Sequence, residues 1–172
     1  MSCRSSPPLH PMIVHLPLAL ALVVPLLALV VALGWWRHWW PARSWTLVVL
    51  LQALLVAGAW AALETGEDDE ERVEAVVSEQ ALEVHEERAE VFLSGAVAVL
   101  VATLLPLVIP APAWKRSSVA LALIGTLVVA ALAVRVGEAG GELVYRHGAA
   151  SVHVGSGATG EGTVGVAERD ED

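Results

Sequence analysis

The chain has little of the chemistry that most enzymes use. Its 172 residues include a single cysteine, Cys3, which lies in a short polar arm. One cysteine excludes an intrachain disulfide, a C-x-x-C redox pair and a cysteine zinc site. No nucleophile lies beside a base, no phosphate-binding loop is present, and no pair of carboxylates has a convincing catalytic spacing. We therefore assign no catalytic residue, and the sequence argues against an enzyme more than for one.

Charge is missing from four long stretches of the chain. Residues 44–63, 91–109 and 117–134 contain no charged side chain, and residues 9–36 contain only two histidines. A helix of 18 or more apolar residues can cross about 30 Å of hydrocarbon. The chain is 56% hydrophobic with a mean hydropathy of +0.63. The pattern predicts an all-α, polytopic membrane protein that lies in the lipid bilayer.

The connections between these stretches predict an up-down bundle of four transmembrane helices, because short loops join antiparallel neighbours. We expect an N-terminal arm at residues 1–8, a membrane domain at 9–147 and a disordered, acidic, glycine-rich tail at 148–172. The first apolar stretch is too long for a signal peptide and ends in GWWRHWW, so we expect it to stay in the protein. The predicted helices span about residues 11–34, 44–64, 68–109 and 117–147.

The orientation follows from where the basic residues lie. Two short connections combine tryptophan with Arg37, Arg43, Lys115 and Arg116. Tryptophan beside lysine or arginine marks a membrane interface, and dense basic residues mark the cytoplasmic side. We therefore predict a multi-pass protein of the bacterial cytoplasmic (inner) membrane with both termini extracytoplasmic.

An acidic segment separates the second and third apolar stretches. Residues 64–90 contain twelve acidic residues and two arginines, with no proline or glycine from residue 68 to 94. We expect the third helix to extend out of the membrane through this segment on the extracytoplasmic side. Its glutamates recur at spacings of 4, 3 and 4 and form one stripe on a helix; they are Glu79, Glu83, Glu86 and Glu90. The stripe is either a solvated face or a docking surface for a basic partner, such as a redox protein or another membrane subunit.

Two further classes of function are disfavoured. The predicted helices carry no charged side chain at mid-depth, whereas a proton- or ion-coupled transporter normally needs ionisable groups there. The net charge of −9 disfavours nucleic-acid binding.

Four histidines are predicted to converge at the extracytoplasmic end, where odd helices begin and even helices end. They are His10, His15, His85 and His147. A buried imidazole needs a partner, which is either a structural hydrogen bond or a metal. His10 and His15 are five residues apart and so point about 140° apart on a straight helix, unless Pro17 distorts it. His85 lies opposite the glutamate stripe and should point into the bundle.

This convergence suggests a haem b or transition-metal site for electron transfer. Helices 1 and 3 are diagonal, so His15 and His85 could ligate one iron from opposite sides, and His10 with His85 or His147 is the alternative if His15 lies too deep. Glycines after the fourth apolar stretch would admit a second helix or a flat ligand; they are Gly137, Gly140 and Gly141. Charged residues nearby are candidates to pair with propionates or to support the ligands; they are Arg88, Arg135, Glu138 and Arg146.

Two end motifs resemble those of a family of small bacterial membrane proteins of unknown function. HPMIVHLP at residue 10 is similar to its H-P-x-x-V-H-x-P opening, and GGELVYRHG at residue 140 to its closing G-G-x-L-V-Y-x-H-G. The resemblance implies four helices and, because some relatives are fused to Rieske or cytochrome-type domains, a redox setting. This chain departs from the family pattern in its long acidic segment and in VRVGEAGG, where a tryptophan often precedes the glycine pair.

Overall fold

The chain folds into helices throughout the part that the structure describes. This structure is a computed structural model, and it describes residues 9–73 and 77–146. The elements in chain order are α1 (Leu9–Ile13), α2 (His15–Trp36), the 3-10 helix η1 (Ala42–Trp45), α3 (Thr46–Val73), α4 (Glu79–Val108) and α5 (Pro112–Tyr145). Within the described residues, four helical segments are long and apolar enough to cross a membrane. The predicted all-helical fold with four spans is confirmed.

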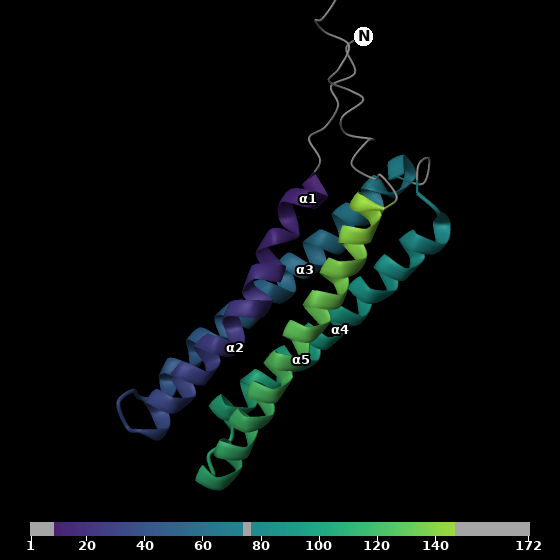
Figure 1. The fold of residues 1–172 in the computed structure, drawn as a ribbon. Coiled ribbons are helices and arrows are strands. Elements are labelled where there is room, and N and C mark those ends of the chain that lie inside the picture. The colour runs from purple at the N-terminus through teal and green to yellow at the C-terminus, as the bar shows by residue number, and fades with distance from the viewer. Residues whose placement is uncertain (1–8, 74–76, 147–172) are drawn as a thin grey trace, which may run out of the picture.

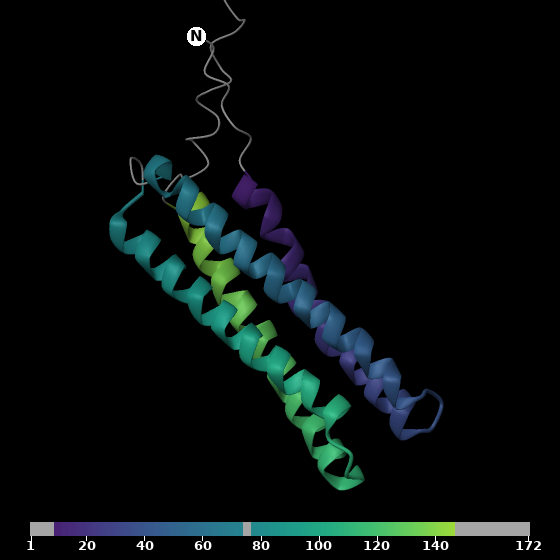
Figure 2. The same cartoon turned by 180° about the vertical axis from the view of Figure 1, so that it is seen from behind.

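The helices form two antiparallel hairpins that lie side by side (Figures 1 and 2). One hairpin consists of α1, α2 and α3, and the other of α4 and α5. Contacts run from α2 to α3, α3 to α4, α4 to α5 and α5 back to α2. The helices α2 and α4 are therefore diagonal, as an up-down bundle requires. Both hairpins begin at the same end of the bundle.

The first helix is interrupted at Val14. Proline has no N–H, so Pro17 cannot donate a hydrogen bond to the Ile13 carbonyl. The chain makes a turn at Val14, whose N–H donates to the His10 carbonyl at 3.1 Å, and α2 begins at His15. Pro11, expected at the first helical position, is instead the third residue of α1, where its missing N–H still costs no intrahelical bond.

The division of the acidic segment differs from the prediction. The helix expected over residues 68–109 begins only at Glu79, because α3 continues through Gly66 to Val73. A glycine inside a helix costs only about 1 kcal/mol, so it need not end one. Ser78, a favoured N-cap residue type, has the extended conformation (φ −68°, ψ 136°) that starts α4. The acidic extension is thus shared between α3 and α4.

The second hairpin buries the same helical positions as the first. Five buried residues of α4 each lie 75 positions after a buried residue of α2: Pro17, Ala21, Val24, Ala28 and Val31 correspond to Phe92, Ala96, Val99, Thr103 and Pro106. Five buried residues of α5 lie 74 positions after buried residues of η1 and α3: Trp45, Val48, Gln52, Leu55 and Ala59 correspond to Val119, Ala122, Thr126, Val129 and Ala133. The hairpins are therefore equivalent halves, related by a pseudo-two-fold axis that runs along the bundle.

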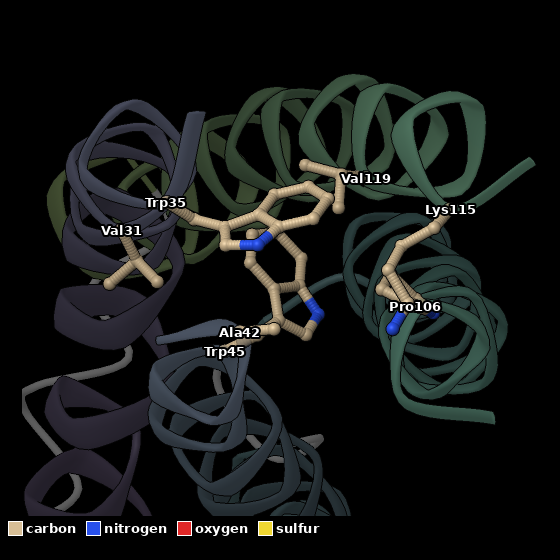
Figure 3. Close-up of a pocket in the computed structure, with 7 residues that line it drawn as sticks. All are labelled: Val31, Trp35, Ala42, Trp45, Pro106, Lys115 and Val119. Atoms are coloured by element: carbon tan, nitrogen blue, oxygen red, sulfur yellow. The ribbon is translucent and has the colours of Figure 1, made fainter. Parts of the chain in front are cut away.

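The first hairpin is tied to the second by two side chains. The Trp45 indole N–H donates to the Thr103 carbonyl at 2.9 Å, and the Gln52 amide donates to the Ala96 carbonyl at 3.0 Å. At this turn end Trp35 and Trp45 lie in the gap between the hairpins, with Lys115 across from them (Figure 3). The cavity there measures about 10 Å³, room for roughly one water. This cavity is too small to hold a cofactor.

Candidate functional site

Two of the four predicted histidines meet at the end where both hairpins begin. The ring centroids of His10 in α1 and His85 in α4 are 6.4 Å apart, and the ring planes are perpendicular. His15 has an exposed side chain on α2, so the imidazole beside His85 is that of His10. This difference follows from the five-residue spacing, which turns the two histidines of the first helix in different directions. His147 lies outside the described residues.

The His10 ring rests on the backbone of α3. Its Nδ1 lies 2.7 Å from the Ala62 carbonyl oxygen, a distance at which the Nδ1–H donates to that oxygen. In a neutral imidazole this leaves the lone pair on Nε2. A Cβ atom added at Gly66 would lie 3.2 Å from Cε1 and 3.3 Å from Nδ1 of this ring. The ring therefore occupies the space that a side chain at residue 66 would need.

The His85 ring rests on α5 in the same way. The backbone of Val136 lies close enough to interact with the ring as a hydrogen-bond acceptor, while Nδ1 of His85 is buried and has no hydrogen-bond partner. The bond to Val136 therefore uses Nε2, and the free lone pair is on Nδ1. A Cβ added at Gly140 would lie 3.3 Å from Cε1 of His85. Each hairpin thus supplies one histidine, one carbonyl and one glycine.

The three glycines predicted to allow close packing behave differently from one another. A Cβ added at Gly140 would lie 3.3 Å from the His85 ring, whereas a Cβ added at Gly137 or Gly141 would meet nothing within 4 Å. Gly66 was not among the glycines predicted to allow close packing, although a Cβ added there would lie 3.2 Å from the His10 ring, slightly closer than the 3.3 Å at Gly140. The missed signal was its spacing: Gly66 follows His10 by 56 residues, and Gly140 follows His85 by 55.

Charged residues surround an open groove next to His85. The groove has a volume of about 450 Å³ and is lined by Arg88, Glu138, Gly141, Glu142, Tyr145 and Arg146. Arg88 donates to the Arg135 carbonyl at 3.3 Å, which ties α4 to α5 about one turn further along α4 than His85. Arg146 pairs with Glu142 at 3.1 Å on the exposed surface. Among the predicted propionate partners, Arg88 lies on the same helix as a predicted ligand, three residues after His85.

The glutamate stripe lies mainly on the surface of α4. Glu79, Glu83 and Glu90 are exposed, and Glu86 is partly buried. The stripe belongs to the same end of the bundle as the histidine pair. Its role as a docking surface stays a prediction.

The histidine pair does not belong to a larger ligand cluster in the described part of the chain. Among residues 9–73 and 77–146, no group of three or more His, Cys, Asp or Glu side chains is placed to hold a metal ion. The pair therefore offers two protein ligands, which limits the kinds of metal centre that it suits.

Comparison with known proteins places the chain in a recognised group. Residues 6–153 match the model of a family described as "Predicted membrane protein (DUF2231)". This range contains both end motifs and all four apolar helices. No curated protein and no solved structure matches the chain.

Proposed function

The chain belongs to the DUF2231 family of predicted membrane proteins, and because that description assigns no activity, we propose a function from the geometry of the histidine pair. In this proposal His10 and His85 ligate the iron of a haem b from opposite sides, and the chain is an electron-transfer module of the membrane. The observation that carries the proposal is the 6.4 Å separation of the two imidazoles, which come from different hairpins, His10 from α1 and His85 from α4.

The separation suits one metal ion between the rings. A metal–imidazole bond is about 2 Å long and the ring centroid lies about 1 Å beyond the nitrogen, so two such ligands place their centroids about 6 Å apart. The distance between His10 and His85 is 6.4 Å. Each ring also bonds a backbone group through its other nitrogen, which is how ligating histidines are usually oriented.

The number of ligands favours haem over a bare ion. Structural zinc takes four protein ligands and catalytic zinc three, whereas this pair has no third ligand among the described residues. Two histidines are, by contrast, a complete axial set for a haem iron. Haem held in this way would supply reversible one-electron transfer. Arg88, beside the groove at the same end, is the candidate partner for a propionate.

The location of the site follows from the predicted orientation. The turns between helices carry Arg37, Arg43, Lys115 and Arg116, and the positive-inside rule predicts that this end is cytoplasmic. The histidine pair lies at the opposite end, so we place it on the extracytoplasmic side. There it would exchange electrons with a partner outside the cytoplasm.

An absorption spectrum tests the proposal. The full-length chain is expressed with supplemented haem precursor and purified in detergent, and we expect a Soret band that shifts on reduction. His10→Ala and His85→Ala should each lose this band, and His15→Ala, whose exposed side chain is five residues from His10, should keep it. Elemental analysis is run in parallel. A colourless protein without metal rejects the proposal, and stoichiometric copper or zinc without haem replaces it with a bare-ion site.

A second candidate function is docking of a basic partner. It is favoured by the exposure of Glu79, Glu83 and Glu90 at the end that carries the histidine pair. Attraction between unlike charges would weaken as salt rises. Binding of a basic c-type cytochrome, measured at low and high salt, should be lost when these three glutamates are changed to glutamine. Binding that is insensitive to both changes rejects docking through this surface.

A further inference from the structure

We infer that Gly66 and Gly140 are paired positioning residues, each of which opens a backbone carbonyl to one imidazole of the site. The inference rests on the proposed function, since it explains how the two ligands are aimed. Within each hairpin the arrangement is complete: His10 with Ala62 and Gly66, and His85 with Val136 and Gly140.

Helix geometry explains why the glycine lies four residues after the carbonyl. A helical side chain leans toward the N-terminus and covers the turn before its own Cα. The side chain at position i+4 therefore lies over the carbonyl of residue i and shields it from an outside donor. Ala62 and Gly66 have this spacing, and so do Val136 and Gly140.

The contacts agree with this account at both positions. The ring atom nearest to an added Cβ is Cε1 at both positions. It is Cε1 of His10 at 3.2 Å for Gly66, and Cε1 of His85 at 3.3 Å for Gly140. Both distances are shorter than ordinary van der Waals contact, so a methyl group would push the ring away from its carbonyl. Gly137 and Gly141 on the same helix as Gly140 have open space instead. A glycine in a helix is therefore not sufficient by itself to bring an imidazole against a backbone carbonyl.

The pseudo-two-fold relation strengthens the assignment. Ala62 and Val136 are 74 residues apart, as are Gly66 and Gly140, and this is also the spacing of the equivalent buried residues of α3 and α5. His10 and His85 are 75 apart, which is the spacing of the equivalent residues of α2 and α4. Both half-sites therefore occupy the same place in their hairpins, and a ligand shared by them lies between the hairpins on the pseudo-axis.

The test compares two glycine variants with one control variant in the full-length protein. Gly66→Ala and Gly140→Ala should each weaken haem binding about 10- to 100-fold, the usual effect of disturbing a residue that orients a metal ligand, and should shift the low-spin electron paramagnetic resonance spectrum. Gly137→Ala, whose added methyl group meets nothing within 4 Å, is the control and should bind as the wild type does. Alanine is the better helix former, so loss of helix stability does not account for weaker binding.

A second measurement keeps this inference separate from the haem proposal. In the haem-free protein, ¹⁵N-histidine NMR should show a protected Nδ1–H at His10, which Gly66→Ala exposes to exchange and Gly137→Ala does not. If the wild type takes up no haem but shows this exchange pattern, the haem proposal fails, whereas the positioning role of the two glycines is supported. The inference is overturned if both Gly66→Ala and Gly140→Ala keep the haem affinity, the spectrum and the hydrogen exchange of the wild type. It is also overturned if the control variant loses as much haem affinity as they do.

Discussion

His10 and His85 occupy equivalent positions in the two hairpins, but the helices that carry them differ. His10 is on α1, a helix of 5 residues that a turn at Val14 separates from α2. His85 is on α4, which runs without interruption for 30 residues. The His10 ring has its Nδ1 bonded to α3, whereas Nδ1 of His85 is buried without a partner. The comparison suggests one adjustable half-site and one fixed half-site.

Removing each imidazole and then replacing it from solution tests this difference most strongly. His10→Gly and His85→Gly should both lower haem affinity by more than about 100-fold, because each removes half of the axial set. Free imidazole should restore the low-spin spectrum in His10→Gly, whose ring lies on a short helix at the end of the bundle. It should restore less in His85→Gly, where the free nitrogen is buried. Equal recovery of the spectrum in both variants would contradict the distinction.

The break in the first helix should matter only to the N-terminal half-site. Pro17→Ala restores an N–H that can bond the Ile13 carbonyl, so α1 and α2 can join and His10 rotates away from Ala62. We expect haem affinity to fall about tenfold, or about 1.4 kcal/mol. Pro25→Ala, in the same helix and away from the site, is the control. Titration of haem into both purified variants measures the effect, and an unchanged affinity in Pro17→Ala would show that the break does not aim His10.

The hairpins also differ in how they hold each other, because both ties come from the first. Trp45→Phe removes the hydrogen bond from the indole to the Thr103 carbonyl while keeping most of the buried ring area. A buried hydrogen bond of this kind contributes about 1 kcal/mol, so the free energy of unfolding should fall by that amount in detergent. Trp60→Phe, at a residue that is 58% exposed, should have almost no effect. Equal loss in the two variants would remove the argument for a tie at Trp45.

Much of this fold follows from the sequence, because four long runs without charge leave few alternatives to four spans. The boundary between α3 and α4 did not follow. Residues 68–94 contain neither proline nor glycine, and the one local signal for a break is Ser78, a residue type that is favoured at N-caps but is also tolerated inside helices. Such a break is set by where the two hairpins meet, which depends on long-range packing rather than on local propensity.

The end of the bundle at which the site lies could be predicted from the sequence, but which two histidines lie together could not. The up-down topology brought His10 and His85 to one end of the bundle, and the spacing of His10 and His15 showed that they point in different directions. Choosing between them required the rotation of α1, which the turn at Val14 controls. To predict the position of Gly66 beside the His10 ring, one must know the register of α1 against α3, which the sequence of a single helix does not determine. The local sequence pattern therefore indicated histidines as the candidate ligands, whereas contacts between helices determine that His10 and His85 are the pair.

The smallest expected effect concerns Gln52 and its equivalent in the second hairpin, Thr126. The Gln52 amide bonds the Ala96 carbonyl across the hairpins, but its Oε1 is buried without a partner, whereas the Thr126 hydroxyl bonds the Leu123 carbonyl of its own helix at 2.8 Å. Gln52→Leu removes one favourable bond and one unsatisfied acceptor together, and the two effects nearly cancel. The free energy of unfolding should change by less than about 1 kcal/mol, as it should in Thr126→Val. Thermal unfolding of both variants checks this, and a clearly larger loss in Gln52→Leu would mean that Oε1 has a partner in the membrane, such as a buried water.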